Sequence, residues 1–305
     1  MNDSVVLAVR NLTKLYKSVP AIDAVSFSVT QGEVVGFVGL NGAGKSTTIN
    51  IILGFLRASS GSVKIFGQAI VPQNAHRSHY KTGFASGDMS LFANLSGKQY
   101  LSFISHRYGM KNQDRLRELT KRFEPQLDKK INDLSRGNKQ KIALIAAFMA
   151  SPELVILDEP SSGLDPLMQQ LFVELIREET ARGTTIFMSS HYLNEVVEVC
   201  SRILLIRDGK LIKDMPATQL ISKGAKMVRI VSRHIVKPPG VAELVVQKRH
   251  KSGYELSFTY KADPSKLQNW LGGVPHLIDI TIADHALEGA FEDLYALETS
   301  KAPHV

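Results

Sequence analysis

Short apolar runs separated by segments of helical periodicity dominate the first two-thirds of the chain. Four of these runs are predicted strands, and they cover residues 33–39, 154–157, 184–188 and 203–206. Apolar runs without polar alternation are typical of parallel strands, because helices cover both faces of such a sheet. The repeated order of strand and helix therefore predicts an α/β fold with a parallel sheet at its core.

One long segment interrupts this order. No strand pattern is present between Ser96 and Ala150, and stretches such as Asp114–Phe123 carry apolar and charged residues at helical spacing. We therefore expect an inserted helical subdomain over about residues 88–150.

The periodicity changes after a turn at residues 208–210. From Tyr254 to Tyr260 apolar and polar side chains alternate, which predicts a half-buried strand, and residues 243–247 form a shorter candidate. The connection through Gly253 indicates a hairpin. We expect residues 1–215 to form the first domain and residues 216–305 a small α+β accessory domain.

The composition is that of an ordinary globular protein. Apolar residues make up 44% of the 305 positions, and 37 Lys and Arg stand against 29 Asp and Glu, a net charge of +8. The longest apolar stretch, residues 142–150, is far shorter than the roughly 20 residues of a membrane-spanning helix. The single cysteine, Cys200, excludes an internal disulfide and a zinc site built from cysteines, and no signal-peptide pattern opens the chain. We therefore expect a protein of the reducing cytoplasm.

Part of the positive charge lies in a basic stretch over residues 223–251. A contact with nucleic acid or anionic lipid is one interpretation, and a solvated face is the other. No aromatic residue is interleaved before Tyr254, so the stretch lacks a stacking platform for bases. We interpret it as a solvated face and expect no nucleic-acid partner.

The strongest chemical signal follows the first apolar run. The motif GxxxxGK[ST] begins at Gly39 and ends at Ser46, between a predicted buried strand and an apolar helix over residues 47–55. In such a loop the backbone N–H groups surround the phosphates, Lys45 reaches the β and γ oxygens, and the Ser46 hydroxyl binds Mg²⁺. We expect the phosphates to be held by Gly39, Leu40, Asn41, Gly42, Ala43, Gly44, Lys45, Ser46 and Thr47.

Two adjacent acids end the apolar run at 154–157. One carboxylate at this position can hold the metal ion while the other polarises a water molecule, and phosphoryl transfer needs both. We assign Asp158 with Ser46 to Mg²⁺ and Glu159 to catalysis. His191 follows a strand that ends in serines, so it is expected at the same edge of the sheet as a second catalytic residue, although a lone histidine is more often structural.

Further motifs, in this order along the chain, resemble the ATP-binding cassette (ABC) family from about Val6 to Pro216. Residues 134–141, which read LSRGNKQK, are similar to the family's signature loop and the helix after it, and residues 162–165 (SGLD) to its D-loop. The resemblance implies a P-loop NTPase fold of the ABC ATPase type. Such a fold has a parallel-sheet core, an antiparallel N-terminal β subdomain and an inserted helical subdomain.

The resemblance also implies a nucleotide site shared between two chains. In the family two cassettes pack head to tail, so Ser135 and Gly137 of one chain would contact the γ-phosphate held by the other. Asp165 would belong to the same site, and Tyr16 falls where an aromatic ring stacks on adenine. A core aromatic is the alternative interpretation of Tyr16.

The sequence departs from the family pattern at two places. Arg136 and Asn138 stand in the signature loop where glycine and glutamine are commoner. Gly87, followed by Asp88, stands where the family has a glutamine that senses Mg²⁺ and the membrane partner. Three interpretations of Gly87 are open. The ligand is lost, Asp88 has taken over its role, or a glycine is required because the backbone has a positive φ angle.

We interpret the chain as an ATP-hydrolysing subunit that powers a separate ABC-2-type transmembrane permease, an exporter, through ATP-driven pairing with a second cassette. Such a subunit would lie at the cytoplasmic face of the membrane. The segment around Leu287, Phe291 and Leu294 resembles the ending of cassettes that serve ABC-2-type exporters. The alternative is a soluble regulatory or nucleic-acid-related ABC ATPase without transport.

Overall fold

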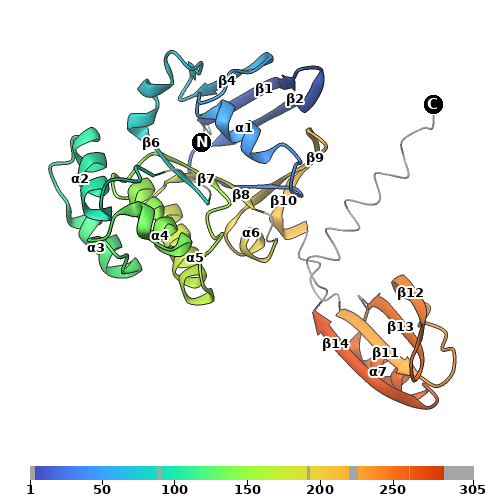
Figure 1. Cartoon of the computed structure of the whole chain (residues 1–305). Coiled ribbons are helices and arrows are strands. Elements are labelled where there is room, and N and C mark those ends of the chain that lie inside the picture. The colour runs from blue at the N-terminus through green and yellow to red at the C-terminus, as the bar shows by residue number, and fades with distance from the viewer. Residues whose placement is uncertain (1–3, 88–90, 191–192, 220–225, 261, 285–305) are drawn as a thin grey trace. The chain divides into compact units, whose positions relative to one another are not determined.

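The computed structural model describes residues 4–87, 91–190, 193–219, 226–260 and 262–284 (Figure 1). The chain divides into two compact units, Met1–Ala217 and Thr218–Val305. No helix in these described ranges is both long enough and apolar enough to cross a membrane.

A six-stranded sheet forms the centre of the first unit. Its order is β10-β9-β3-β8-β7-β6, with β3 over Val34–Val38, β6 over Thr82–Ser86, β7 over Leu154–Asp158, β8 over Thr185–Ser190, β9 over Arg202–Arg207 and β10 over Lys210–Pro216. All neighbouring pairs are parallel except β9 and β10, which are antiparallel. Strands β3, β7 and β8 are buried along their whole length, as the absence of polar alternation predicted.

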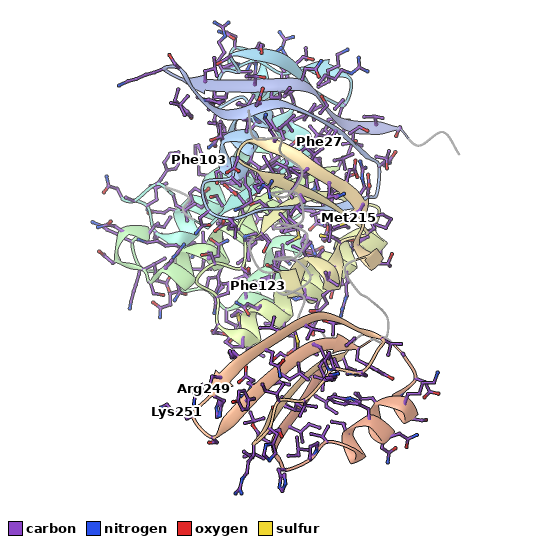
Figure 2. All side chains as sticks on the ribbon, turned by 90° about the vertical axis from the view of Figure 1, so that its right-hand side faces the viewer. Phe27, Phe103, Phe123, Met215, Arg249 and Lys251 are labelled. Carbon is purple, nitrogen blue, oxygen red and sulfur yellow. The ribbon has the colours of Figure 1, made fainter. Side chains whose placement is uncertain are left out.

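A second, antiparallel sheet covers one face of the central sheet. Its order is β2-β1-β4-β5, with β1 over Val5–Tyr16, β2 over Val19–Thr30, β4 over Ser60–Ile65 and β5 over Gln68–Ala69. Phe27 of β2, labelled in Figure 2, stacks on Phe187 of β8 with ring centroids 5.4 Å apart. The ring centroids of Phe27 and of Phe37 in β3 are 5.9 Å apart. These rings join the sheets in one core, to which helix α1 (Lys45–Ile52) contributes Ile49 and Ile52.

Helices complete the first unit. They are α2 over Gly97–Arg107, α3 over Asp114–Phe123, α4 over Arg136–Phe148, α5 over Pro166–Ala181 and α6 over Leu193–Val199. The first three form the predicted helical insertion. Ser96 caps α2 in a reciprocal pair of hydrogen bonds with Gln99, and residues 142–148 of α4 are all buried, so α4 anchors the insertion against β6.

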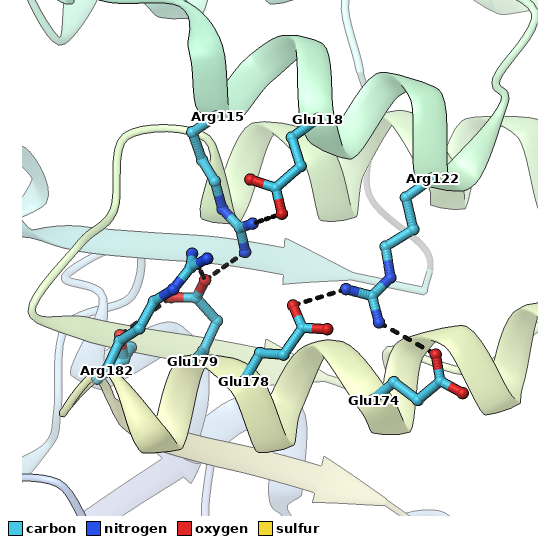
Figure 3. A network of polar contacts seen from close by, with 8 residues as sticks. Arg115, Glu118, Arg122, Glu174, Glu178, Glu179 and Arg182 are labelled. Atoms are coloured by element: carbon cyan, nitrogen blue, oxygen red, sulfur yellow. Dashed lines mark hydrogen bonds and ion pairs between the residues drawn. The ribbon is translucent and has the colours of Figure 1, made fainter.

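Ion pairs join α3 of the insertion to α5 of the core (Figure 3). Arg122 donates to Glu178 at 2.7 Å and to Glu174 at 3.3 Å. Arg115 contacts Glu179, whose side chain is only 1% exposed.

The second unit is a four-stranded antiparallel sheet with one helix. Its order is β12-β13-β11-β14, with β11 over Lys226–Ser232, β12 over Ala242–His250, β13 over Gly253–Tyr260, β14 over Leu277–Asp284 and helix α7 over Pro264–Gly272. The pairing of β12 with β13 confirms the predicted hairpin, at whose end Arg249 and Lys251 lie (Figure 2). Phe258 packs edge-on against Trp270 at 5.2 Å in the core.

Two cations of the basic stretch, Arg229 and Lys248, are paired with carboxylates of this unit. Glu255 accepts hydrogen bonds from Arg229 at 2.7 Å and lies 2.9 Å from Lys248 Nζ. Asp279 accepts a further bond from Arg229 at 3.1 Å. These contacts neutralise two of the cations of the stretch within the unit.

Candidate functional site

The glycine-rich loop connects β3 to α1 as its motif requires. Gly44 precedes the helix with φ +104°, a conformation that other residues rarely adopt. A Cβ atom there would also lie 2.7 Å from the carbonyl oxygen of Ala21, so β2 packs directly against the loop. The buried Lys45 ammonium donates to the carbonyl oxygens of Gly39 at 2.7 Å and Leu40 at 3.2 Å. The loop therefore closes around the lysine that the motif assigns to phosphates.

The two acids at the end of β7 occupy different environments. Asp158 is buried and accepts a hydrogen bond from the hydroxyl of Ser189 at 2.5 Å. Glu159 is partly exposed, and its Oε1 lies 3.5 Å from Lys45 Nζ. Its φ of +49° is unusual for a residue with a side chain, and its N–H donates to Ser189 Oγ at 3.1 Å. Ser189 thus holds the side chain of one acid and the backbone of the next.

A pocket of about 710 Å³ gathers these groups. Its described lining consists of Asn41, Ser46, Asn50, Phe55, Phe84, Ser86, Gly87, Arg136, Asp158 and Glu159. Ser46 and Asp158, the two residues assigned to Mg²⁺, both line it. Hydroxyl and carboxylate oxygens are the hard ligands that Mg²⁺ prefers, so the donor set fits this ion.

The signature loop forms the start of α4. Ser135 is the N-cap of the helix, and its Oγ accepts a hydrogen bond from the side-chain amide of Asn138 at 3.2 Å. Arg136 donates to the Ser162 hydroxyl at 2.9 Å and reaches the pocket. Neither Ser135 nor Gly137 is among the described residues that line the pocket of their own chain. The unusual Arg136 therefore ties the start of α4 to the segment that follows the two acids at the end of β7.

Gly87 is confined by space and not by its backbone angle. Its N–H donates to the carbonyl oxygen of Asp158 at 2.9 Å, which continues the pairing of β6 with β7. A Cβ atom at this position would lie 2.8 Å from the carbonyl oxygen of Glu159 and 3.1 Å from Ser162 Cβ, while φ lies outside the left-handed region. The expectation of a positive φ is therefore wrong, and close approach to Glu159 explains the glycine. Asp88 lies outside the described residues.

Three other residues were predicted to belong to the site, namely Tyr16, Asp165 and His191, and the structure describes the first two of them. Tyr16 ends β1 with 51% of its surface exposed, so its alternative interpretation as a core aromatic is wrong. Asp165 caps α5 by accepting the N–H of Met168 at 2.9 Å. His191 lies outside the described residues, directly after the end of β8.

Sequence reasoning missed Glu195 of α6 and the serines around it. Glu195 Oε2 accepts hydrogen bonds from the hydroxyls of Ser161 at 2.8 Å and Ser190 at 3.1 Å. Burial raises the pKa of Glu195 to about 7 despite these bonds. The only signals in the sequence are an acid among valines, four residues after His191, and a strand that ends in serines.

Comparisons with known proteins agree with this geometry. The ABC transporter family profile matches residues 22–162. Nod factor export ATP-binding protein I of Burkholderia orbicola is 31% identical over 88% of this chain and 90% of its own length, and the bacitracin transport ATP-binding protein of Bacillus licheniformis is 28% identical over 95% and 97%. A solved ATP-binding subunit of an ABC transporter is 30% identical, with a TM-score of 0.66, over 70% of this chain and 91% of that one. The chain therefore belongs to the ABC transporter family, as an ATP-binding and ATP-hydrolysing subunit.

Proposed function

We propose that this chain pairs with a second cassette and uses Mg²⁺-dependent ATP hydrolysis to drive export through a separate ABC-2-type permease. The observation that carries the proposal is the convergence of Lys45, Ser46, Asp158 and Glu159 on one pocket. The full-length similarity to two proteins named for bacitracin transport and Nod factor export supports export as the direction.

Each side chain in the pocket has a specific role in this proposal. Ser46 and Asp158 hold Mg²⁺, which neutralises charge on the phosphate oxygens when bound. Lys45, now bonded to loop carbonyls and near Glu159, turns to the β and γ oxygens of ATP. Glu159 is then free to orient the attacking water, and His191 assists the reaction as a second catalytic residue.

The signature residues act on the ATP of the partner cassette. Ser135 and Gly137 lie at the start of α4, where backbone N–H groups suit an anion. Since neither lines the pocket of its own chain, a second chain supplies the phosphate that they contact. Tyr16, exposed at the end of β1, stacks on adenine, and Asp165 contributes to the shared site through the segment that it caps.

Exposed aromatic residues of the helical insertion support a contact with the permease. Phe92 and Phe103 are 53% and 48% exposed, and their rings pack edge-on at 5.4 Å. Phe92 follows Gly87 by five residues, so the patch lies close in sequence to the pocket. In this arrangement residues 1–215 form the motor at the cytoplasmic face of the membrane, and residues 216–305 form an accessory domain.

Glu159→Gln tests the proposal. The variant keeps a hydrogen-bonding side chain and loses the carboxylate, so phosphate release should fall on the order of a hundredfold or more while ATP binding persists. Sedimentation with and without Mg²⁺-ATP should then show an ATP-dependent dimer, because ATP bridges both chains. Phosphate release at the parent rate would reject the role of Glu159.

The permease is tested by purification from membranes. A polytopic membrane protein should co-purify with the wild-type chain and be lost when Phe92 and Phe103 are both changed to serine. Ile235→Ser, which changes an exposed apolar side chain of the second unit, is the control. A chain that hydrolyses ATP but recovers no membrane protein would favour the regulatory ABC ATPase.

A further inference from the structure

Glu195 is a partly buried acid without a cationic partner in the described part of the chain. Its Oε2 accepts both serine hydrogen bonds, and its Oε1 is completely buried with no hydrogen-bond partner. The amide oxygen of a glutamine could also accept the hydrogen bonds that the two serine hydroxyls donate to Oε2. A purely structural role therefore does not require a carboxyl group at this position.

The side chain bridges the two segments that present the catalytic residues. Ser161 follows Glu159 by two residues, and Ser190 is the last residue of β8, next to Ser189. Ser161 is 4% exposed and Ser190 is 1% exposed, so water does not compete for these bonds. Through Ser189 the same strand end holds the backbone of Glu159. A movement of the Glu195 side chain would therefore shift the position of the Glu159 carboxylate.

The charges around Glu195 leave its ionisation finely balanced. Cys200, the residue after the end of α6, is buried. On α6 itself, Glu198 opposes the ionisation of Glu195 but is paired with Arg177 of α5 at 2.9 Å. The segments that contribute Ser161 and Ser190 offer neutral hydroxyls, and His191 beyond them lies outside the described residues. Because burial raises its pKa to about 7, the group changes charge near neutral pH.

We propose that Glu195 is a positioning residue for hydrolysis, whose ionised form ties Ser161 to Ser190 and so fixes Glu159 against the nucleotide. A carboxylate strengthens hydroxyl hydrogen bonds relative to a neutral acid, so the bridge is tight when the group is charged and loose when it is protonated. The role rests on the hydrolysis proposed above and adds a dependence on pH to it.

The test is the pH profile of phosphate release by the full chain with Mg²⁺-ATP. In the wild type, kcat should rise as Glu195 ionises through pH about 7. The side chain in Glu195→Gln cannot ionise, so the rise in kcat with pH, the rising limb of the profile, should be absent. Well above pH about 7, kcat of this variant should be lower than that of the wild type on the order of fivefold, the difference between a charged and a neutral hydrogen bond. KM for ATP should stay unchanged, because the phosphates are held by the loop that starts at Gly39.

Matched variants separate this role from other causes. Glu198→Gln, on the exposed side of the same helix, should keep the rise in kcat with pH but move it to slightly lower pH, because Glu198 opposes the ionisation of Glu195. Ser161→Ala should lower kcat at high pH as Glu195→Gln does. This second variant tests the bridge even if the Glu195 variant fails to fold. A limb that persists in Glu195→Gln, as titration of His191 would produce, overturns the proposal. A wild type that releases no phosphate at any pH instead rejects the proposed function itself.

Discussion

Two glutamates at opposite ends of the central sheet, Glu179 buried and Glu195 partly buried, show how differently one side chain can be used. Glu179, near the amino end of β8, accepts hydrogen bonds from Arg115, from Arg182 at 3.0 Å and from Thr184 at 3.1 Å (Figure 3). Glu195, beyond the carboxyl end of β8, accepts hydrogen bonds from two serine hydroxyls and from no cation among the described residues. A buried charge with cationic partners holds structure in one form, whereas a buried acid without them can change its charge. The amino end is therefore built for stability and the carboxyl end for chemistry.

The largest expected effect comes from breaking the amino-end network. Glu179→Ala leaves Arg115, which is 10% exposed, without its buried partner, and the free energy of unfolding should fall by about 3–5 kcal/mol. Urea denaturation measures this loss. The neighbouring Glu178→Ala, whose parent side chain is 44% exposed, should cost less than about 1 kcal/mol. Equal losses in both variants would contradict the assignment of Glu179 as the anchor.

The second prediction uses the pH dependence of stability to expose Glu195. Its folded-state pKa is raised from 4.5 to about 7, so between these values the folded form holds a proton that the unfolded form has lost. The contribution of Glu195 to the free energy of unfolding should therefore be highest at low pH and fall as pH rises from 4.5 through about 7. The total fall should be about 3 kcal/mol, at about 1.36 kcal/mol per pKa unit. Urea midpoints of the wild type and Glu195→Gln across this range measure it. Parallel stability profiles would show that the carboxyl group does not titrate there.

The third prediction concerns close packing at the carboxyl end. Gly87→Ala places a Cβ atom 2.8 Å from the carbonyl oxygen of Glu159, so the backbone must shift at Glu159, the proposed catalytic acid. We expect a loss of about 1–3 kcal/mol in stability together with a lower rate of phosphate release. Gly240→Ala, where a Cβ would meet nothing within 4 Å, is the control. Because the obstacle is space, Gly87→Gln should be no more active than Gly87→Ala, and a gain specific to glutamine would restore the interpretation of a lost ligand.

The smallest expected effect lies at the exposed border of the amino-end network. Arg122→Ala removes contacts to Glu174 and Glu178, both of which are nearly half exposed. Solvent screens such pairs, so unfolding free energy should fall by about 0.5–1 kcal/mol, and less at high salt. Denaturation at two ionic strengths measures this. A loss as large as that of Glu179→Ala would mean that the whole network acts as one unit.

The predictable part of the molecule is the part that contiguous residues encode. The loop from Gly39 to Ser46, the acids at the end of β7 and the N-cap Ser135 were all assigned from local motifs, and the structure brings the loop and the acids to one pocket. The strands could be predicted from the sequence because burial on both faces of a sheet removes the alternation of apolar and polar residues. The helical insertion could be predicted for the converse reason. Its helices expose one face to solvent, so apolar residues recur at helical spacing.

The tertiary structure alone decided which of these residues meet and what lies between them. Ser161 and Glu195 are 34 residues apart and Arg115 and Glu179 are 64 apart, and no local pattern marks either pair. Gly87 is small because β6 pairs with β7 and brings it against Glu159, a consequence of strand order that its own neighbours in sequence do not reveal. The sequence by itself determined the nucleotide chemistry, because phosphate-binding loops and strand-end acids are local. The burial that sets the charge of Glu195 and the space at Gly87 depend on distant segments packed together.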